Sequence, residues 1–209
     1  RGCLGCCYRR GGNRPCNICP IPYGDCVAPV ITIMGNIGSG KSAQAKLIAA
    51  ELGWETFSTG QLIRESGDKE VIEAHNQGEL APTEFVQQMI LDKVQSIDSS
   101  KGVILDGSPR MLEEAVRYDQ DFPKFCRKLN LVIVLKLDKE EAINRLKLRG
   151  RVDDTPEAIA SRFETYETEV KPVINRYKEA GIVREVDGHG SVEEVKARVL
   201  KVLNDEHLG

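Results

Sequence analysis

The stretch GNIGSGKS at residues 35–42 decides the fold. It matches the whole pattern G-x-x-x-x-G-K-[ST], in which glycines let backbone N–H groups turn toward phosphate oxygens. The apolar run VITIM at residues 30–34 predicts a strand before it, and residues 43–52 predict a helix after it. This order predicts a nucleotide-phosphate site rather than a glycine-rich turn with a surface lysine. The residues expected around the phosphates are Gly35, Gly38, Ser39, Gly40, Lys41 and Ser42.

Two side chains of this loop have chemical tasks. Lys41 can reach the β- and γ-phosphates of a bound nucleotide, and Ser42 can ligate Mg²⁺. Asp106 follows the apolar run at residues 103–105. An acid at the end of such a strand is expected to hold Mg²⁺, directly or through water, with a turn or helix cap as the alternative.

The composition narrows the function. The chain has 209 residues, a formal net charge of −3 and 41% hydrophobic residues. This length can bury a sizeable core, and the charge gives no support for nucleic-acid binding. We find neither an apolar run of membrane-spanning length nor a secretory-signal pattern, so we expect no membrane association and a cytoplasmic location.

Short apolar runs alternate with amphipathic stretches from residue 30 onward. Further strands are expected at residues 103–105, 131–135 and 182–186. Further helices are expected at residues 83–97, 111–119, 139–148, 156–180 and 192–204. The alternation predicts an α/β fold of three layers, a parallel sheet with helices on both faces.

Other stretches depart from this alternation. Residues 1–28 form a separate cysteine-rich appendage, which leaves residues 29–209 as the main domain. Residues 58–88 are mostly helical and are expected to form an insert between two strands. Residues 149–154 are too short and too charged to join the core.

Arginines gather at the ends of the expected elements. Planar guanidinium groups bind phosphate oxygens through two hydrogen bonds. A reaction between two nucleotides must hold about four or five phosphates together, so several cations are needed to offset the repulsion. For a single arginine, a solvated surface role is the better interpretation. The candidates are Arg64, Arg110, Arg149, Arg151 and Arg162.

Five motifs in one order resemble the adenylate kinase family of nucleoside monophosphate kinases, from about residue 30 to residue 203. They are GNIGSGKS at 35–42, STGQLIRE at 58–65, DGSPR at 106–110, GRVDD at 150–154 and SRFETY at 161–166. The resemblance implies a P-loop NTPase fold with a helical monophosphate-binding insert at 58–88 and a very short lid at 149–154. It implies reversible, Mg-dependent phosphoryl transfer from ATP to AMP, giving two ADP, by a protein expected to be a monomer.

The resemblance also implies roles for individual residues. Arg149 would contact the ATP phosphates, and Gly190 would supply backbone near the ATP adenine. Asp153 and Asp154 would orient the lid arginines, in a region that also precedes a helix and can cap it. The residues expected to be catalytic are Lys41, Arg110, Arg149, Arg151 and Arg162. The residues expected around AMP are Thr59, Arg64, Glu79, Leu80, Ala81, Gly107, Arg110, Glu114, Arg151 and Arg162.

The expected reaction needs no covalent intermediate. An acceptor phosphate oxygen is already anionic near neutral pH, so it can attack the γ-phosphorus in line without a general base. Catalysis then consists of positioning and of charge stabilisation by Lys41, Mg²⁺ and the arginines. Closure of the insert and the lid would exclude water.

Three positions bear on the acceptor nucleotide. Ser108 stands where the family has an aromatic residue, which removes apolar surface. Glu114 stands where the family has a glutamine that reads adenine. An ionised carboxylate only accepts hydrogen bonds and suits guanine, unless Glu114 turns to solvent. Thr59 is typical of the AMP type, since relatives that use UMP or CMP tend to have alanine. We therefore expect AMP, with GMP and less readily CMP or UMP as alternatives.

The lid and the appendage are unusual. Arg149 and Arg151 are separated by one glycine, which predicts either less complete closure or a different placement of Arg149. Six of the seven cysteines lie in the first 26 residues. Two C-x-x-C pairs among them predict a zinc site, with disulfides or a disordered tail as alternatives. The expected zinc ligands are Cys3, Cys6, Cys16 and Cys19.

A hypothesis from another class makes the chain a kinase-fold subunit, docked on a larger assembly through its appendage. The partner of such an appendage is unknown. Retention of Lys41, Asp106 and the arginines favours an active enzyme.

Overall fold

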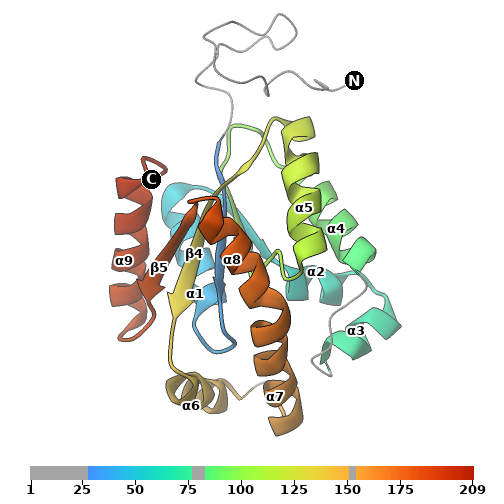
Figure 1. Cartoon of the computed structure of the whole chain (residues 1–209), viewed down its shortest axis with the longest axis vertical. Coiled ribbons are helices and arrows are strands. Elements are labelled where there is room, and N and C mark those ends of the chain that lie inside the picture. The colour runs from blue at the N-terminus through green and yellow to red at the C-terminus, as the bar shows by residue number, and fades with distance from the viewer. Residues whose placement is uncertain (1–27, 77–82, 151–153) are drawn as a thin grey trace, which may run out of the picture.

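The computed structural model describes residues 28–76, 83–150 and 154–209, and it confirms the α/β architecture expected from the sequence (Figure 1). Five parallel strands form one sheet in the order β2-β3-β1-β4-β5. The strands are β1 (Val30–Gly35), β2 (Glu55–Ser58), β3 (Val103–Asp106), β4 (Leu129–Lys136) and β5 (Val183–Asp187). The sequence did not predict β2, because the strand contains no apolar run. Phe57 is the only buried residue among the four residues of this strand.

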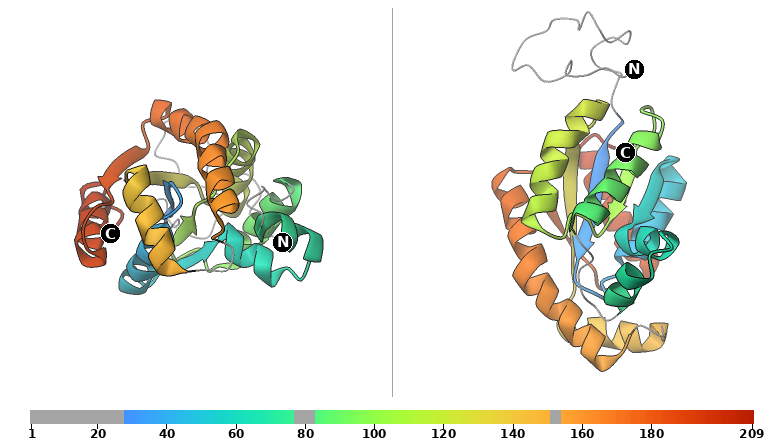
Figure 2. Two further views of the ribbon diagram at one scale, coloured as in Figure 1. Left: turned by 90° about the horizontal axis from the view of Figure 1, so that it is seen from below. Right: turned by 90° about the vertical axis from the view of Figure 1, so that its right-hand side faces the viewer.

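Helices cover both faces of the sheet. They are α1 (Lys41–Leu52), α2 (Thr59–Glu65), α3 (Lys69–Asn76), α4 (Thr83–Ser96), α5 (Leu112–Asp121), α6 (Lys139–Arg149), α7 (Pro156–Thr165), α8 (Lys171–Glu179) and α9 (Val192–Asp205). Buried residues of α1 and α9 pack on one face. Those of α4, α5 and α8 pack on the other, as the two views in Figure 2 also show. A 3₁₀ turn follows α5 at Phe122–Phe125.

The central strand β1 is buried on both faces. Ile31 and Ile33 point into the core under α1 and α9, while Val30 and Met34 point into the opposite core. Between them, the buried hydroxyl of Thr32 lies 3.1 Å from the carbonyl oxygen of Leu105 and 2.6 Å from that of Ser108. The contact with Ser108 fixes the loop after β3 against strand β1, and this loop belongs to the candidate site.

One long helix was expected at residues 156–180, and the structure interrupts it. A π-helical segment at Tyr166–Val170 separates α7 from α8. Pro172 lies in the first turn of α8. It has no N–H with which to continue the ladder of α-helical hydrogen bonds, and the wider turn accommodates this loss.

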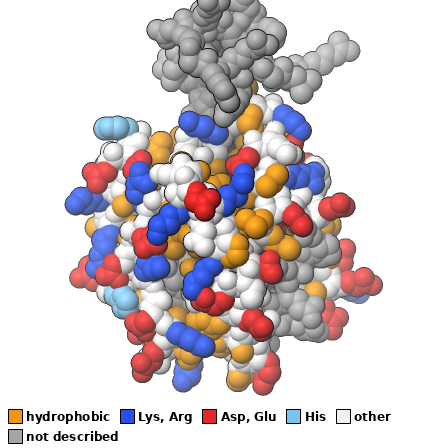
Figure 3. All heavy atoms as spheres, in the orientation of Figure 1, with side chains coloured by type: hydrophobic (Ala, Val, Ile, Leu, Met, Phe, Trp, Pro, Cys, Tyr) orange, Lys and Arg blue, Asp and Glu red, His pale blue; other side chains and the backbone are white. Residues whose placement is uncertain are grey.

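Several expectations fall outside the described residues. They concern Arg151, Asp153, Glu79, Leu80, Ala81 and the cysteines of the appendage. On the face drawn in Figure 3, described side chains of both charge signs are interspersed. None of the described helices has the length and apolar character required to cross a bilayer.

Candidate active site

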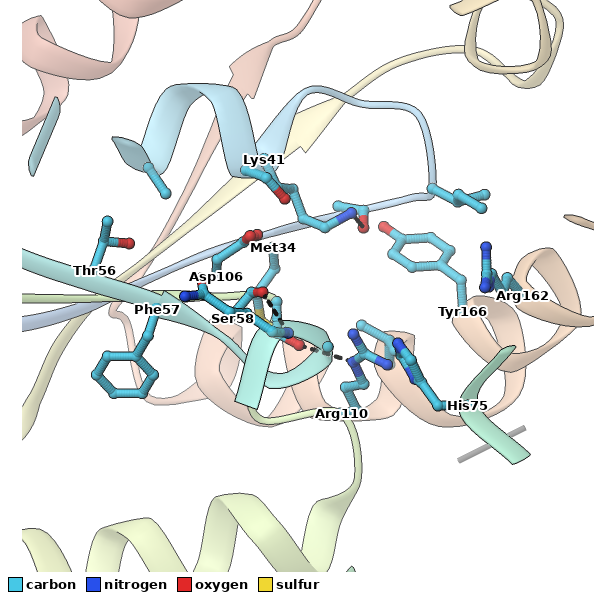
Figure 4. A pocket seen from close by; sticks show the side chains of 18 of the residues that line it. Met34, Lys41, Thr56, Phe57, Ser58, His75, Asp106, Arg110, Arg162 and Tyr166 are labelled. Atoms are coloured by element: carbon cyan, nitrogen blue, oxygen red, sulfur yellow. Dashed lines mark hydrogen bonds between the residues drawn. The ribbon is translucent and has the colours of Figure 1, made fainter. Parts of the chain in front are cut away.

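A cavity of about 420 Å³ lies at the carboxyl ends of the strands (Figure 4). The chain continues from β1 to β2 on one side of the sheet and from β3 to β4 on the other, and ligands of open parallel sheets bind at such a switch point. The predicted site residues that line the cavity are Gly35, Lys41, Ser42, Arg64, Asp106, Gly107, Arg110 and Arg162. Residues more than 120 positions apart in the sequence thus meet in one site.

The glycine loop has a backbone that other residues would disturb. Gly38 has φ +79°, and a Cβ atom there would lie 2.5 Å from the carbonyl oxygen of Ala142. Gly40, with φ +91°, precedes α1, and no side chain caps the first turn of this helix. The N–H groups of that turn and the positive end of the helix dipole therefore face the loop, which suits phosphate oxygens.

Lys41 is the cation at the centre of the loop. Its Nζ atom lies 2.9 Å from the carbonyl oxygen of Gly35 and 2.7 Å from that of Asn36. The pKa of Lys41 is lowered to about 8, mainly by burial; Asp106 opposes the shift, and Arg110 and Arg149 contribute to it. These influences place two arginines and one acid within electrostatic reach of the ammonium group, as a phosphate-binding centre requires.

Asp106 and Ser42 fit the magnesium site expected from the sequence. Asp106 ends β3 opposite Ile33 of β1, is 7% exposed, and lines the cavity together with Ser42. One carboxylate and one hydroxyl suit an ion that takes its other ligands from substrate phosphates and water. Within the described ranges, no group of three or more His, Cys, Asp or Glu could hold a metal ion.

The expected lid acid contacts two of the expected arginines. Asp154 accepts hydrogen bonds from Arg149 Nε (2.9 Å) and Nη2 (2.6 Å), and Arg162 Nη1 lies 3.4 Å from it. Its side chain is 4% exposed. The capping role belongs to Thr155, whose hydroxyl accepts from the N–H of Ala158 at the start of α7. Asp154 therefore joins the end of α6 to α7 across the short lid.

Glu114 occupies a place that the sequence did not suggest. It is 4% exposed, so the alternative that it turns to solvent is wrong. Its Oε2 atom accepts a hydrogen bond of 2.8 Å from the backbone N–H of Arg110. Burial raises the pKa of Glu114, while this N–H and the Arg110 charge oppose the shift. The carboxylate therefore contacts the backbone of Arg110. Glu114 is absent from the described lining of the cavity.

Ser108 and Thr59 lie beside the same half of the site. The Ser108 hydroxyl is 2.7 Å from the hydroxyl of Tyr118, and both residues are buried. Tyr118 also stacks on Phe122, so an aromatic side chain of α5 packs where Ser108 leaves room. The Thr59 hydroxyl is buried and has no hydrogen-bond partner. Such an orphaned group calls for a ligand or water.

The cavity also has lining residues that sequence reasoning missed. Gln61, His75 and Tyr166 come from α2, α3 and the π-helical segment. No pattern in the sequence marked them, because their positions depend on how the helices pack. Arg145 was missed as well. Its Nη1 is 3.1 Å from the carbonyl oxygen of Gly188 and its Nη2 is 3.5 Å from that of Gly190. These hydrogen bonds connect α6 to the loop around Gly190, which is expected near the ATP adenine.

Comparisons with known proteins agree with this geometry. The family model described as adenylate kinase matches residues 33–182. The chain is 36% identical to the adenylate kinase of Mycolicibacterium vanbaalenii and 34% identical to that of Mycolicibacterium paratuberculosis. It is 33% identical to the adenylate kinase of Bifidobacterium longum. Each match covers 83% of this chain and 98% of the relative. A phosphate loop, an acid at the end of the adjacent strand β3 and converging arginines thus stand in a sequence that belongs to the adenylate kinase family.

Proposed function

We propose that the chain transfers the γ-phosphoryl group of MgATP to AMP, reversibly, and that the cavity holds both sets of phosphates. One observation carries this proposal: Lys41 and Asp106 line the same cavity as Arg64, Arg110 and Arg162. A site for a single nucleotide has no need of three additional guanidinium groups opposite the phosphate loop. A site for two nucleotides needs them to offset phosphate repulsion.

Each residue has a task in this proposal. The loop amides and Lys41 bind the β- and γ-phosphates of ATP. Ser42 and Asp106 hold Mg²⁺, which neutralises charge on the donor phosphates when it is bound. Arg64 and Arg110 orient the AMP phosphate, and Thr59 offers its unpaired hydroxyl to the same nucleotide.

The reaction is an in-line displacement. An oxygen of the AMP phosphate bonds to the γ-phosphorus while the bond from that phosphorus to the β–γ bridging oxygen breaks, which leaves ADP on both sides. The acceptor oxygen is already anionic, so no residue has to remove a proton. Arg149 and Arg162 stabilise the transferring group. Within the main domain, 29–209, closure of the insert at 58–88 and of the lid at 149–154 over the cavity excludes water.

The experiment is a coupled spectrophotometric assay for nucleoside diphosphate production, with MgATP as donor and AMP, GMP, CMP or UMP as acceptor. We expect the highest kcat/KM with AMP. A higher value with GMP would replace AMP as the assigned acceptor. Absence of turnover with all four acceptors, in a sample shown to be folded, would instead favour the role of a kinase-fold subunit in an assembly.

The appendage, location and oligomeric state stay proposals. The two C-x-x-C pairs support zinc bound by Cys3, Cys6, Cys16 and Cys19 in a reducing cytosol. We propose that the protein is a monomer. Elemental analysis of protein purified under reducing conditions tests the metal. Less than about half an equivalent of zinc contradicts the four-cysteine site. Light scattering tests the monomer.

A further inference from the structure

His75 is a buried imidazole in the acceptor half of the cavity. It belongs to α3, is 8% exposed, and lines the cavity together with Arg64 and Arg110. The chain has three histidines in all, and the other two, His189 and His207, are exposed. The proposed phosphoryl transfer gives His75 no task.

The backbone of α2 makes room for this ring. A Cβ atom on Gly60 would lie 2.8 Å from His75 Nε2 and 3.4 Å from Arg64 Nη1. The imidazole edge and the guanidinium group of Arg64 therefore meet against the same bare Cα atom. His75 is thus fixed beside a group that we assign to the acceptor phosphate.

The order of the side chains along the cavity, from the donor phosphates to the acceptor phosphate, places His75 beside the nucleoside of the acceptor. In the view of Figure 4, Arg110 lies between Asp106 and His75. The donor phosphates belong to Lys41 and Asp106, and the acceptor phosphate belongs to the arginines. A side chain beyond those arginines meets the sugar and base that the acceptor phosphate carries.

The expected base reader is engaged elsewhere. Glu114 directs its carboxylate to the backbone N–H of Arg110 and stays out of the cavity lining. His75 is in the lining and carries both a hydrogen-bond donor and an acceptor on a flat ring. Such a ring can contact the edge or the face of a purine.

We infer that His75 contacts the base of the acceptor nucleotide and helps to set the preference of this enzyme among nucleoside monophosphates. The inference rests on the proposed function, because it assumes that the cavity binds a monophosphate beside Arg64 and Arg110. It depends on the imidazole that α3 carries at this position.

Nuclear magnetic resonance of the wild-type imidazoles gives a direct test. Three histidines yield three sets of ring signals, which single substitutions at His189 and His207 assign. Saturating AMP should shift the His75 signals and leave those of His207 in place. If AMP binds and the His75 signals do not move, the inference is overturned.

Kinetics of H75L and H75Q give a second test, with H207N as the matched control. His207 is exposed and has φ +57°, a conformation that asparagine tolerates. We expect H75L to raise the KM for AMP about tenfold, the effect of one lost buried hydrogen bond. The KM for ATP should stay within about twofold, since a lost acceptor contact does not touch the donor.

H75Q keeps a donor and an acceptor on its side chain, so it should restore part of the affinity for AMP. It also supplies the kinetic readout if H75L does not fold. Equal rises in both KM values for H75L and H75Q would indicate a structural role and contradict the inference. An unchanged KM for AMP would contradict it as well. Failure of wild-type protein to phosphorylate AMP would instead contradict the proposed function, and the two failures are therefore distinct.

Discussion

Replacing Asp154 with asparagine (D154N) probes how the enzyme holds its lid arginines. The carboxylate binds Arg149 through two hydrogen bonds of 2.9 and 2.6 Å and reaches Arg162 at 3.4 Å. Asparagine has nearly the same shape. It offers one oxygen and turns an NH₂ group toward a guanidinium, so at least one strong contact is lost and another becomes repulsive.

The magnitude follows from these contacts. A hydrogen bond to a charged group contributes about 1.5–3 kcal/mol. The Arg149 side chain is 34% exposed, so solvent screening reduces this figure. We take about 1.4 kcal/mol for the loss of arginine placement in the transition state, which corresponds to a roughly tenfold fall in kcat.

The coupled assay with MgATP and AMP measures this change, and thermal unfolding checks that D154N is folded. D119N is the matched control, because Asp119 also pairs with an arginine, Arg176, at 2.7 Å, but Arg176 does not line the cavity as Arg162 does. We expect D119N to keep wild-type kcat. A kcat for D154N at or above the wild-type value, or an equal fall in D119N, would refute the reasoning.

Three further predictions concern the loop and the acceptor side. Because the pKa of Lys41 is about 8 in the free protein, the charged form that binds phosphate is present below this pH. Hence kcat/KM for ATP should fall as pH rises through about 8, an inflection that K41R should remove. G38A should lower the free energy of unfolding in urea by about 3 kcal/mol, from strain plus overlap, whereas G67A should cost only about 1 kcal/mol. Gly67 also has a positive φ, but open space surrounds it. E114Q should change the KM for AMP by less than about twofold, since Gln keeps an acceptor for the same backbone N–H. A larger change in this KM would indicate that Glu114 contacts the base of the acceptor nucleotide.

Much of the donor half could be predicted from the sequence because it is local. The glycines, Lys41 and Ser42 are neighbours along the chain, and their backbone conformation follows from which residues lack a Cβ atom. Asp106 could be placed because the apolar run before it predicts a strand, and parallel strands end at one edge of the sheet. The structure puts Ser42 and Asp106 in the lining of one cavity.

The acceptor half depended on contacts between distant parts of the chain. The sequence offered Glu114 as a base reader, and the packing of α5 directs this carboxylate to Arg110 instead. It gave no reason to notice His75, which reaches the cavity only because α3 packs on the bare Cα atom of Gly60. Strand β2 escaped notice for a related reason, since its pairing with β3 and not its own composition holds it in the sheet.

The sequence by itself therefore determined the phosphate loop, the alternation of strands and helices and the family motifs, because each depends on residues that are neighbours along the chain. The tertiary structure alone decided which side chains face the acceptor and which ones support them. That choice is made by close packing, where a buried polar group turns to whichever partner lies within hydrogen-bond reach. Glu114 accepts a hydrogen bond from the backbone N–H of Arg110, and Asp154 accepts hydrogen bonds from Arg149 and Arg162.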